Sequence, residues 1–107
     1  MARAIVTVVP PAPRRGDVLE IRTLIAHPME TGFRKDDAGA VVPRNLVTRL
    51  TCRYDGATVF AADLFSAVAA NPTLVFTTVA TRSGPLEITW QGDNGFAQTE
   101  TVSITVA

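Results

Sequence analysis

The sequence has 107 residues, ten of them basic and ten acidic, so its formal net charge at pH 7 is zero. A chain of this length is expected to form a single domain, residues 1–107, that buries roughly two-thirds of the surface exposed by its unfolded form. Zero net charge argues against nucleic acid or an anionic membrane as a partner, and no run approaches the ~20 apolar residues of a membrane helix.

Alternating apolar and polar residues predict strands along most of the chain. A first strand is expected over residues 4–9, ended by three prolines in residues 10–17 because proline lacks a backbone donor and fixes φ. A second is expected over residues 18–26, with leucine and isoleucine at even spacing. Residues 26–45 then form a long irregular segment, and long ordered loops in small domains tend to be functional.

Residues 46–54 have the clearest strand pattern. Four apolar residues share the face predicted to point inward: Leu46, Leu50, Cys52 and Tyr54. Four residues share the face predicted to point outward: Val47, Arg49, Thr51 and Arg53. Asp55-Gly56 predicts a two-residue hairpin turn into a strand over residues 57–63.

Three more strands are expected over residues 73–81, 86–91 and 96–107, separated by the turn sequences RSGP and GDNG. Trp90 alternates in phase with Leu86 and Ile88 and is interpreted as a core residue. The fold class is therefore all-β: an immunoglobulin-like antiparallel β-sandwich of about seven strands. The Cys, Trp and Cys pattern of true immunoglobulin domains is missing, so the analogy concerns architecture alone.

The chemistry-bearing residues are few. One cysteine and one histidine cannot supply the nitrogen and sulfur ligands of a typical metal site, and no sequence motif supports a catalytic serine, so no metal, cofactor or catalytic residue is predicted. Cys52 lies on an apolar strand face, where a thiol is usually an inert core residue. Arg49 and Arg53 form either a patch for an anion or a partner, or a solvated sheet face.

The stretch AHPMETGFRKDD, residues 26–37, contains the only histidine and the only lysine of the chain. Together with the following AGAVVPRNLVTRLTCRYDG, and with DLFSAVAANP, FTTVAT and WQGDNG further on, it resembles the SoxZ family of the bacterial Sox thiosulfate-oxidation system. The resemblance extends from about Leu19 to Ala107. The ordered series of motifs is far more specific than any one of them.

The resemblance implies a partner. SoxZ proteins pair with SoxY in a heterodimer that holds sulfur intermediates on a cysteine in a flexible C-terminal arm of SoxY, and that arm visits the other Sox enzymes. The present sequence ends in TVSITVA, without cysteine, so the resemblance implies a noncatalytic subunit that supports and exposes the partner's carrier cysteine. It also implies a periplasmic location reached by co-export with the partner. The apolar run before Pro10 is too short for a signal peptide, which fits co-export and a cytoplasmic protein equally.

Residues 26–37 are too poor in catalytic partners for an active site, and loops on a rigid scaffold often present binding surfaces. We expect a docking surface for SoxY or for the enzymes it visits, shaped by His27, Met29, Glu30, Arg34 and Lys35, with Arg49 and Arg53 as further candidates. Replacing Met29 and Arg34 by alanine is expected to weaken the complex and to leave the fold intact. The alternative is a loop that only caps the sandwich, with Asp36, Asp37 and Gly39 forming a solvated turn.

Three other possibilities remain open from the sequence. An outward apolar patch that includes Val47 or Phe60 would offer a second interface, and without its partner it would let the chain form a homo-oligomer. A stand-alone immunoglobulin-like binding module is also compatible with the fold, although no exposed aromatic cluster is expected. A thiol enzyme or direct sulfur carrier using Cys52 would require that thiol to be reactive.

Overall fold

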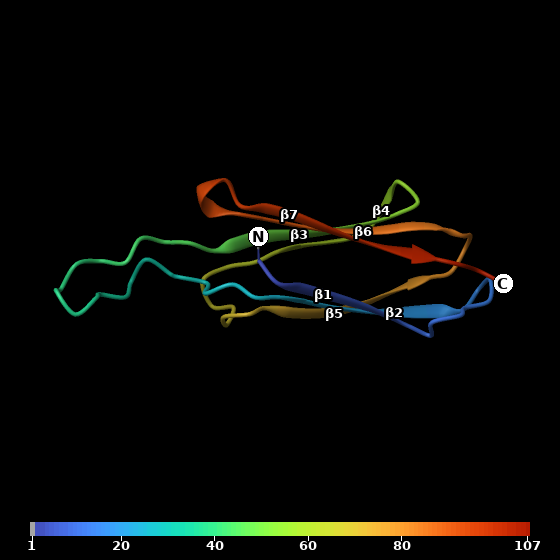
Figure 1. Ribbon diagram of the computed structural model, residues 1–107, viewed down its shortest axis with the longest axis horizontal. Helices are drawn as coiled ribbons and strands as arrows, with labels where there is room; N and C mark the ends of the chain where they lie inside the picture. The colour runs from blue at the N-terminus through green and yellow to red at the C-terminus, as the bar shows by residue number, and fades with distance from the viewer. Residues whose placement is uncertain (1) are drawn as a thin grey trace.

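The computed structural model describes residues 2–107 and shows two antiparallel sheets packed face to face (Figure 1). The first sheet has the order β1-β2-β5, with β1 Ala4–Val9, β2 Val18–Ile25 and β5 Thr73–Val79. The second has the order β4-β3-β6-β7, with β3 Val47–Tyr54, β4 Ala57–Asp63, β6 Gly84–Gly92 and β7 Ala97–Ile104. The predicted seven-stranded immunoglobulin-like sandwich is confirmed.

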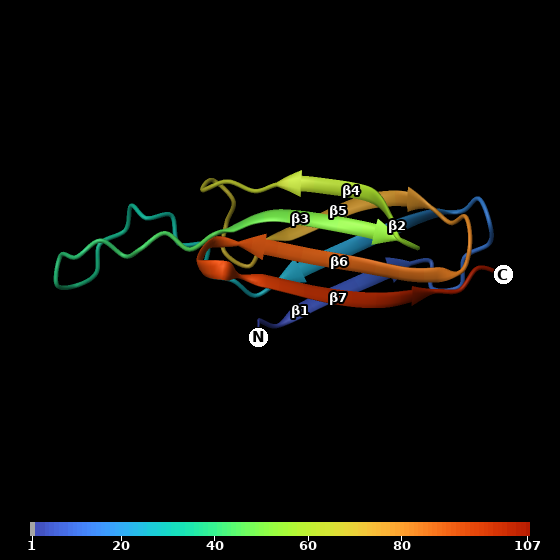
Figure 2. The same ribbon diagram turned by 90° about the horizontal axis from the view of Figure 1, so that it is seen from above.

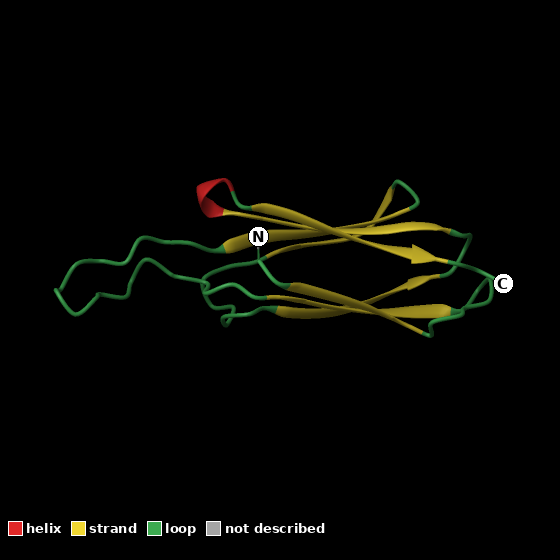
Figure 3. Cartoon of the chain, in the orientation of Figure 1, coloured by secondary structure: helices red, strands yellow, loops and turns green. Residues whose placement is uncertain are grey.

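The sandwich has two distinguishable sides. Seen from above, β4 and β5 lie along one side, and β7 and β1 lie along the other (Figure 2). Phe60 of β4 and Phe76 of β5 stack across the first side with ring centroids 4.1 Å apart. One short helical turn, η1 (Asp93–Gly95), connects β6 to β7 (Figure 3). The predicted hairpin at Asp55-Gly56 is present, and both residues have the positive φ that a tight two-residue turn requires.

The core lies between the inward faces of the two sheets. Trp90 and Cys52 are almost completely buried, which confirms that both are core residues. Strand alternation predicted both positions correctly, because every second side chain of a strand faces the opposite sheet.

The two residues of the predicted outward patch, Val47 and Phe60, are buried and partly buried in the sandwich. Val47 is fully buried, so the prediction that it faces outward is wrong. The pairing of β3 with β6 shifts register between Val47 and Arg49, which breaks the strict alternation at the start of β3. Phe60 is half-buried in its stack on Phe76, and this contact uses one face of its ring.

The segment between β2 and β3, residues 26–45 (here called the arm), projects from one end of the sandwich, in blue-green to green at the left of Figure 1. Its two halves run antiparallel and pair at Glu30 with Asn45 and at Lys35 with Val41. The molecule measures 58 × 20 × 20 Å, with the arm along its long axis. The idea that this segment only caps the sandwich is therefore wrong for its outer half, which extends away from the core.

Residues 2–107 contain no helix of the length and apolarity needed to cross a membrane.

Candidate functional site

The base of the arm is bonded to the sandwich by His27. Its backbone N–H donates to Oδ1 of Asn71 at 3.0 Å, and its carbonyl accepts the backbone N–H of Asn71 at 2.8 Å. The imidazole lies edge-on to the ring of Phe96, with centroids 5.2 Å apart. These contacts fix the point where the chain leaves β2, on the connection that precedes β5.

The ring of His27 is held as a neutral acceptor. Its Nδ1 accepts the backbone N–H of Met29 at 3.1 Å, an interaction that a proton on Nδ1 would abolish. Burial lowers the pKa of His27 because it penalises the charged form, and the negative charge of Asp93 opposes this effect only in part.

Met29 connects the arm to β3 through a buried side chain. The residue has a positive φ of 53°, its side chain is buried, and its sulfur accepts the backbone N–H of Val47 at 3.3 Å. The next residue, Glu30, exchanges two backbone hydrogen bonds of 2.8 Å with Asn45. The arm therefore begins as a fixed two-stranded element.

The returning half of the arm is fixed by Arg44. Its guanidinium donates two hydrogen bonds to the carboxylate of Asp93, at 2.8 and 2.9 Å, and the same carboxylate accepts the backbone N–H of Leu46 at 3.0 Å. The Arg44 guanidinium holds the pKa of Asp93 below its usual value. Gly32 of the opposite half passes so close that a Cβ there would lie 3.2 Å from the Cβ of Arg44.

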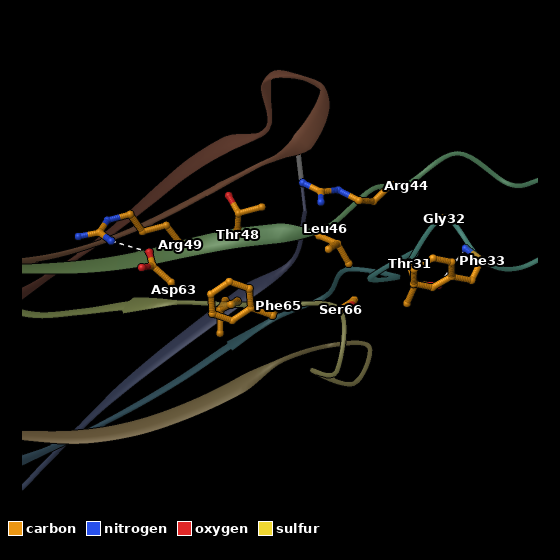
Figure 4. A pocket seen from close by; sticks show the side chains of 11 residues that line it. Thr31, Gly32, Phe33, Arg44, Leu46, Thr48, Arg49, Asp63, Phe65 and Ser66 are labelled. Atoms are coloured by element: carbon orange, nitrogen blue, oxygen red, sulfur yellow. Dashed lines mark hydrogen bonds and ion pairs between the residues drawn. The ribbon is translucent and has the colours of Figure 1, made fainter.

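A groove of about 700 Å³ opens where the arm meets β3 and β4 (Figure 4). Phe33 from the arm and Phe65 after β4 line it, with 83% and 69% of their surfaces exposed. Arg49 lies on its border and donates to Asp63 at 2.6 Å. Two exposed aromatic side chains therefore line the same groove, which the sequence did not indicate.

The structure separates the predicted docking residues into two groups. His27 and Met29 are buried and can shape a surface only from beneath, whereas Arg34 and Lys35 are exposed on the outer half of the arm. Glu30 is half-buried and accepts from Arg34 at 2.6 Å, and that ion pair lowers the pKa of Glu30. Their role in docking stays a prediction.

Burial of Met29 corrects one expected outcome. Replacing Met29 by alanine would open a cavity and remove the acceptor for the Val47 N–H, so we expect the substitution to destabilise the fold, which the sequence did not suggest.

The two arginines of β3 do not form one patch. Arg49 borders the groove, whereas Arg53 lies toward the other end of the strand, where its guanidinium donates to the Gly56 carbonyl at 3.1 Å. Both point outward, as their position in the strand predicted.

Sequence reasoning missed Phe33, Phe65, Arg44 and Asp93. For Phe33 and Phe65, the only available signal was a phenylalanine in a segment without period-2 alternation. Alternation does not place such a residue in the core. Nothing in the sequence indicated that Arg44 and Asp93, which are 49 positions apart, form an ion pair.

Cys52 is enclosed by the sandwich. Its side chain is fully buried, and this burial raises the pKa of the thiol to about 12, so the nucleophilic thiolate is scarcely populated at neutral pH. Within residues 2–107, no group of three or more histidine, cysteine, aspartate or glutamate side chains is placed to hold a metal ion.

Fold and site together define a small immunoglobulin-like sandwich with a projecting two-stranded arm and an apolar groove at its base. A comparison with known protein families matches residues 6–103 to the family described as sulphur oxidation protein SoxZ. Because this match covers nearly the whole sequence, the chain belongs to the SoxZ family and is a subunit of the Sox sulfur-oxidation system. No curated protein matches the chain.

Solved structures share this architecture at low sequence identity. The sulfur carrier protein SoxY from Chlorobium limicola f thiosulfatophilum is 11% identical, with a TM-score of 0.64 over 96% of this chain and 74% of its own. A superoxide reductase (neelaredoxin) variant from Ignicoccus hospitalis is 13% identical, with a TM-score of 0.72 over 97% of this chain and 79% of its own. A putative superoxide reductase from Thermotoga maritima is 14% identical, with a TM-score of 0.73 over 97% and 85%. These likenesses show the fold alone.

Proposed function

We propose that the chain is the noncatalytic subunit of a SoxYZ sulfur-carrier heterodimer that acts in thiosulfate oxidation. It pairs with a SoxY-type protein. The flexible C-terminal segment of that partner bears the cysteine that carries the sulfur intermediates. Family membership supports the assignment to this complex. Burial of Cys52 is the observation that supports placing the sulfur on the partner and not on this chain. A thiol that is both enclosed and protonated is a poor acceptor of sulfur.

In this proposal the arm and the groove at its base form the docking surface of the heterodimer. Phe33 and Phe65 supply exposed aromatic area, and the ion pairs of Arg44 and Arg49 border it with polar groups. An apolar centre with a polar border, rich in aromatic residues and arginine, is typical of specific protein interfaces. The fixed base of the arm keeps this surface ordered before the partner binds, which reduces the entropy lost on binding.

The test is native mass spectrometry of the chain coexpressed with a SoxY-type protein and then exposed to thiosulfate and the Sox enzymes. We expect a 1:1 heterodimer whose added sulfur mass stays on the partner after the subunits are separated. Sulfur mass on Cys52 would overturn the noncatalytic role. If no heterodimer formed, the chain would instead be a stand-alone immunoglobulin-like binding module.

Matched substitutions test the docking surface separately. Phe33→Ser and Phe65→Ser remove exposed aromatic groups, and Ile5→Ser removes an exposed apolar group of β1, outside the groove. We expect the first two to weaken the heterodimer by roughly tenfold or more, as truncation of an aromatic anchor commonly does. The Ile5→Ser protein should bind as the wild type does, and equal losses in all three would exclude the groove as the docking site.

We also propose that the chain acts in the periplasm and reaches it by co-export with its partner. This part of the proposal rests on family membership. Cell fractionation tests it directly: the chain should be periplasmic when the partner carries its export signal and cytoplasmic when that signal is deleted. A chain that reached the periplasm without the partner would exclude co-export.

A further inference from the structure

The edge strand β5 lacks the features that usually protect such a strand from pairing with another one. Over its whole length, residues 73–79, it has no charged residue, no proline and no register shift against β2, which is its only neighbour in the sheet among residues 2–107. Native proteins protect exposed edges with charges, prolines, bulges or covering segments. β5 is therefore an open template for a further strand.

The edges formed by β1 and β7 are protected by one another. At one end, the backbone N–H of Ala2 donates to Gln98 Oε1 at 2.9 Å, and Gln98 Nε2 donates back to the Ala2 carbonyl at 2.7 Å. At the other end, the N–H of Ala107 donates to the carbonyl of Pro13 at 3.0 Å. These bonds join the two sheets along that side of the sandwich (Figure 2).

The remaining edge strand, β4, is also protected. Its pairing with β3 shifts register opposite the step from Cys52 to Arg53, and it ends at the charged, exposed Asp63. A register shift twists an edge, and a charge opposes pairing with another strand. β5 therefore differs from the other three edge strands of the sandwich.

Hydrogen bonds beyond the two ends of β5 show which of its residues face the open edge. The N–H of Ala80 donates to the Asp17 carbonyl at 2.8 Å, and the N–H of Ile25 donates to the Pro72 carbonyl at 3.3 Å. In an antiparallel pair, hydrogen-bonded positions alternate with non-hydrogen-bonded ones. Four residues of β5 consequently direct their backbone N–H and C=O groups away from β2: Thr73, Val75, Thr77 and Val79.

We propose that β5 is the interface of a homodimer, in which β5 of a second copy pairs antiparallel with it about a two-fold axis at Phe76. This register places Val75 opposite Thr77 of the second copy, and Thr73 opposite its Val79. Every residue that faces the open edge then meets another such residue, so the backbone donors and acceptors of both strands are satisfied. An isologous contact of this kind closes on itself and forms a dimer rather than a fibre.

The side chains and charges of the edge suit a second copy of the same chain. Antiparallel pairing of β5 with itself brings no like charges together, and the net charge of the whole chain is zero. Val75 and Val79 are 54% and 46% exposed on the outer face of the sheet, next to Val18 at 61%. Each would be partly covered by a β-branched neighbour across the new pair, a favourable combination in sheets.

Sedimentation equilibrium of the isolated full chain, from micromolar to millimolar concentration, tests the dimer. Thr77→Pro removes an edge N–H that makes no bond to β2, so the fold tolerates it while pairing is blocked. Val75→Lys places a like charge near the two-fold axis without entering the core. We expect the wild type to dimerise and either variant to raise the dimer dissociation constant by about tenfold or more.

Thr101→Pro in β7 is the matched control. The N–H of Gly92 donates to the Phe96 carbonyl at 2.9 Å, so by the same alternation the N–H of Thr101 faces away from β6, and its side chain is exposed. This variant should dimerise as the wild type does. Equal loss of dimer in Thr77→Pro and Thr101→Pro would overturn the assignment to β5.

Amide hydrogen exchange followed by NMR locates the contact. The amides of Thr73, Val75, Thr77 and Val79 should become protected as concentration rises, whereas those of Leu74, Phe76 and Thr78 should be protected throughout. A wild type that stays monomeric at millimolar concentration would overturn the proposal. If Thr77→Pro then weakened the binding of a SoxY-type protein, the occupant of the edge would be a strand of that partner.

Discussion

The two ends of the arm are constructed in different ways. At its base, His27 and Met29 are buried and bonded to the sandwich, and Arg44 is fixed by two hydrogen bonds to Asp93. At its tip, residues 36–40 are exposed and are held by bonds within the turn, where Asp36 Oδ1 accepts the N–H groups of Ala38 and Ala40 at 2.9 Å. Substitutions at the base should therefore change the stability of the fold more than substitutions toward the tip do.

The largest effect is expected where β3 and β6 meet below the arm. A Cβ on Gly92 would lie 2.3 Å from the carbonyl oxygen of Leu46, which is backbone and cannot rotate away. Gly92→Ala should lower the free energy of unfolding by about 3 kcal/mol, a large value for overpacking. A Cβ on Gly39 at the tip would meet no atom of residues 2–107 within 4 Å, so Gly39→Ala should lower the free energy of unfolding by only about 1 kcal/mol, because of its positive φ. Urea denaturation of both proteins measures the difference, and equal losses would contradict the contrast between base and tip.

A smaller loss is expected for Met29→Ala. The substitution removes most of a buried side chain and leaves the Val47 N–H without its sulfur acceptor, so we expect a loss of about 2 to 3 kcal/mol in urea denaturation. Met29→Leu nearly preserves the volume and should cost only about 1 kcal/mol. If the alanine variant were as stable as the wild type, the side chain of Met29 would not anchor the arm.

The sandwich was predictable because each strand repeats a local pattern. Alternation gave the position of Cys52 and Trp90, and Asp55-Gly56 is a turn whose geometry depends on two adjacent residues. Val47 was misplaced because the register shift beside it depends on how β6 pairs with β3, which is not encoded in the alternation of β3 itself.

The arm was predictable as a long irregular segment but not in its construction. Burial of His27 arises from contacts with Asn71 and Phe96, which are 44 and 69 positions away in the sequence. Such contacts follow from the packing of whole strands, and no local sequence pattern predicts them. The docking hypothesis therefore grouped buried anchors such as His27 with exposed residues such as Lys35, which the structure separates.

A third, smaller effect is expected from pH. The pKa of His27 is lowered in the folded protein from an ordinary value of 6.5, so the unfolded chain binds the proton first as pH falls. Stability contributed by neutral His27 is complete above pH 6.5 and declines as pH falls toward the lowered pKa. Because this is the only histidine, it is the main side chain expected to change charge between pH 7 and 5, and thermal unfolding over this range measures its effect.

His27→Asn is the matched variant for this measurement. Its side-chain oxygen can accept the Met29 N–H in place of Nδ1 but does not titrate in this range. The melting temperature of the wild type should fall between pH 7 and 5, and that of the variant should fall less. Identical pH profiles would show that the protonation of His27 is not linked to folding.

The smallest effect on stability is expected from the exposed half of the arm. Arg34 pairs with Glu30 at 2.6 Å, but 59% of the arginine side chain is exposed, and such surface pairs contribute little to stability because water and salt screen their charges. Arg34→Ala and Lys35→Ala should therefore leave the urea midpoint almost unchanged.

The same two substitutions test docking by the exposed half of the arm, since neither residue contributes to the core. If this half meets the partner through its charges, each should weaken the heterodimer with a SoxY-type protein, with a loss that shrinks as salt is raised because screening removes the charge contribution. Arg22→Ala is a matched control, because Arg22 also pairs with a nearby glutamate at 3.2 Å and is 54% exposed, but it lies on β2 away from the arm. Unchanged affinity in both arm variants would confine docking to the groove and leave the exposed half of the arm without a role in the pair.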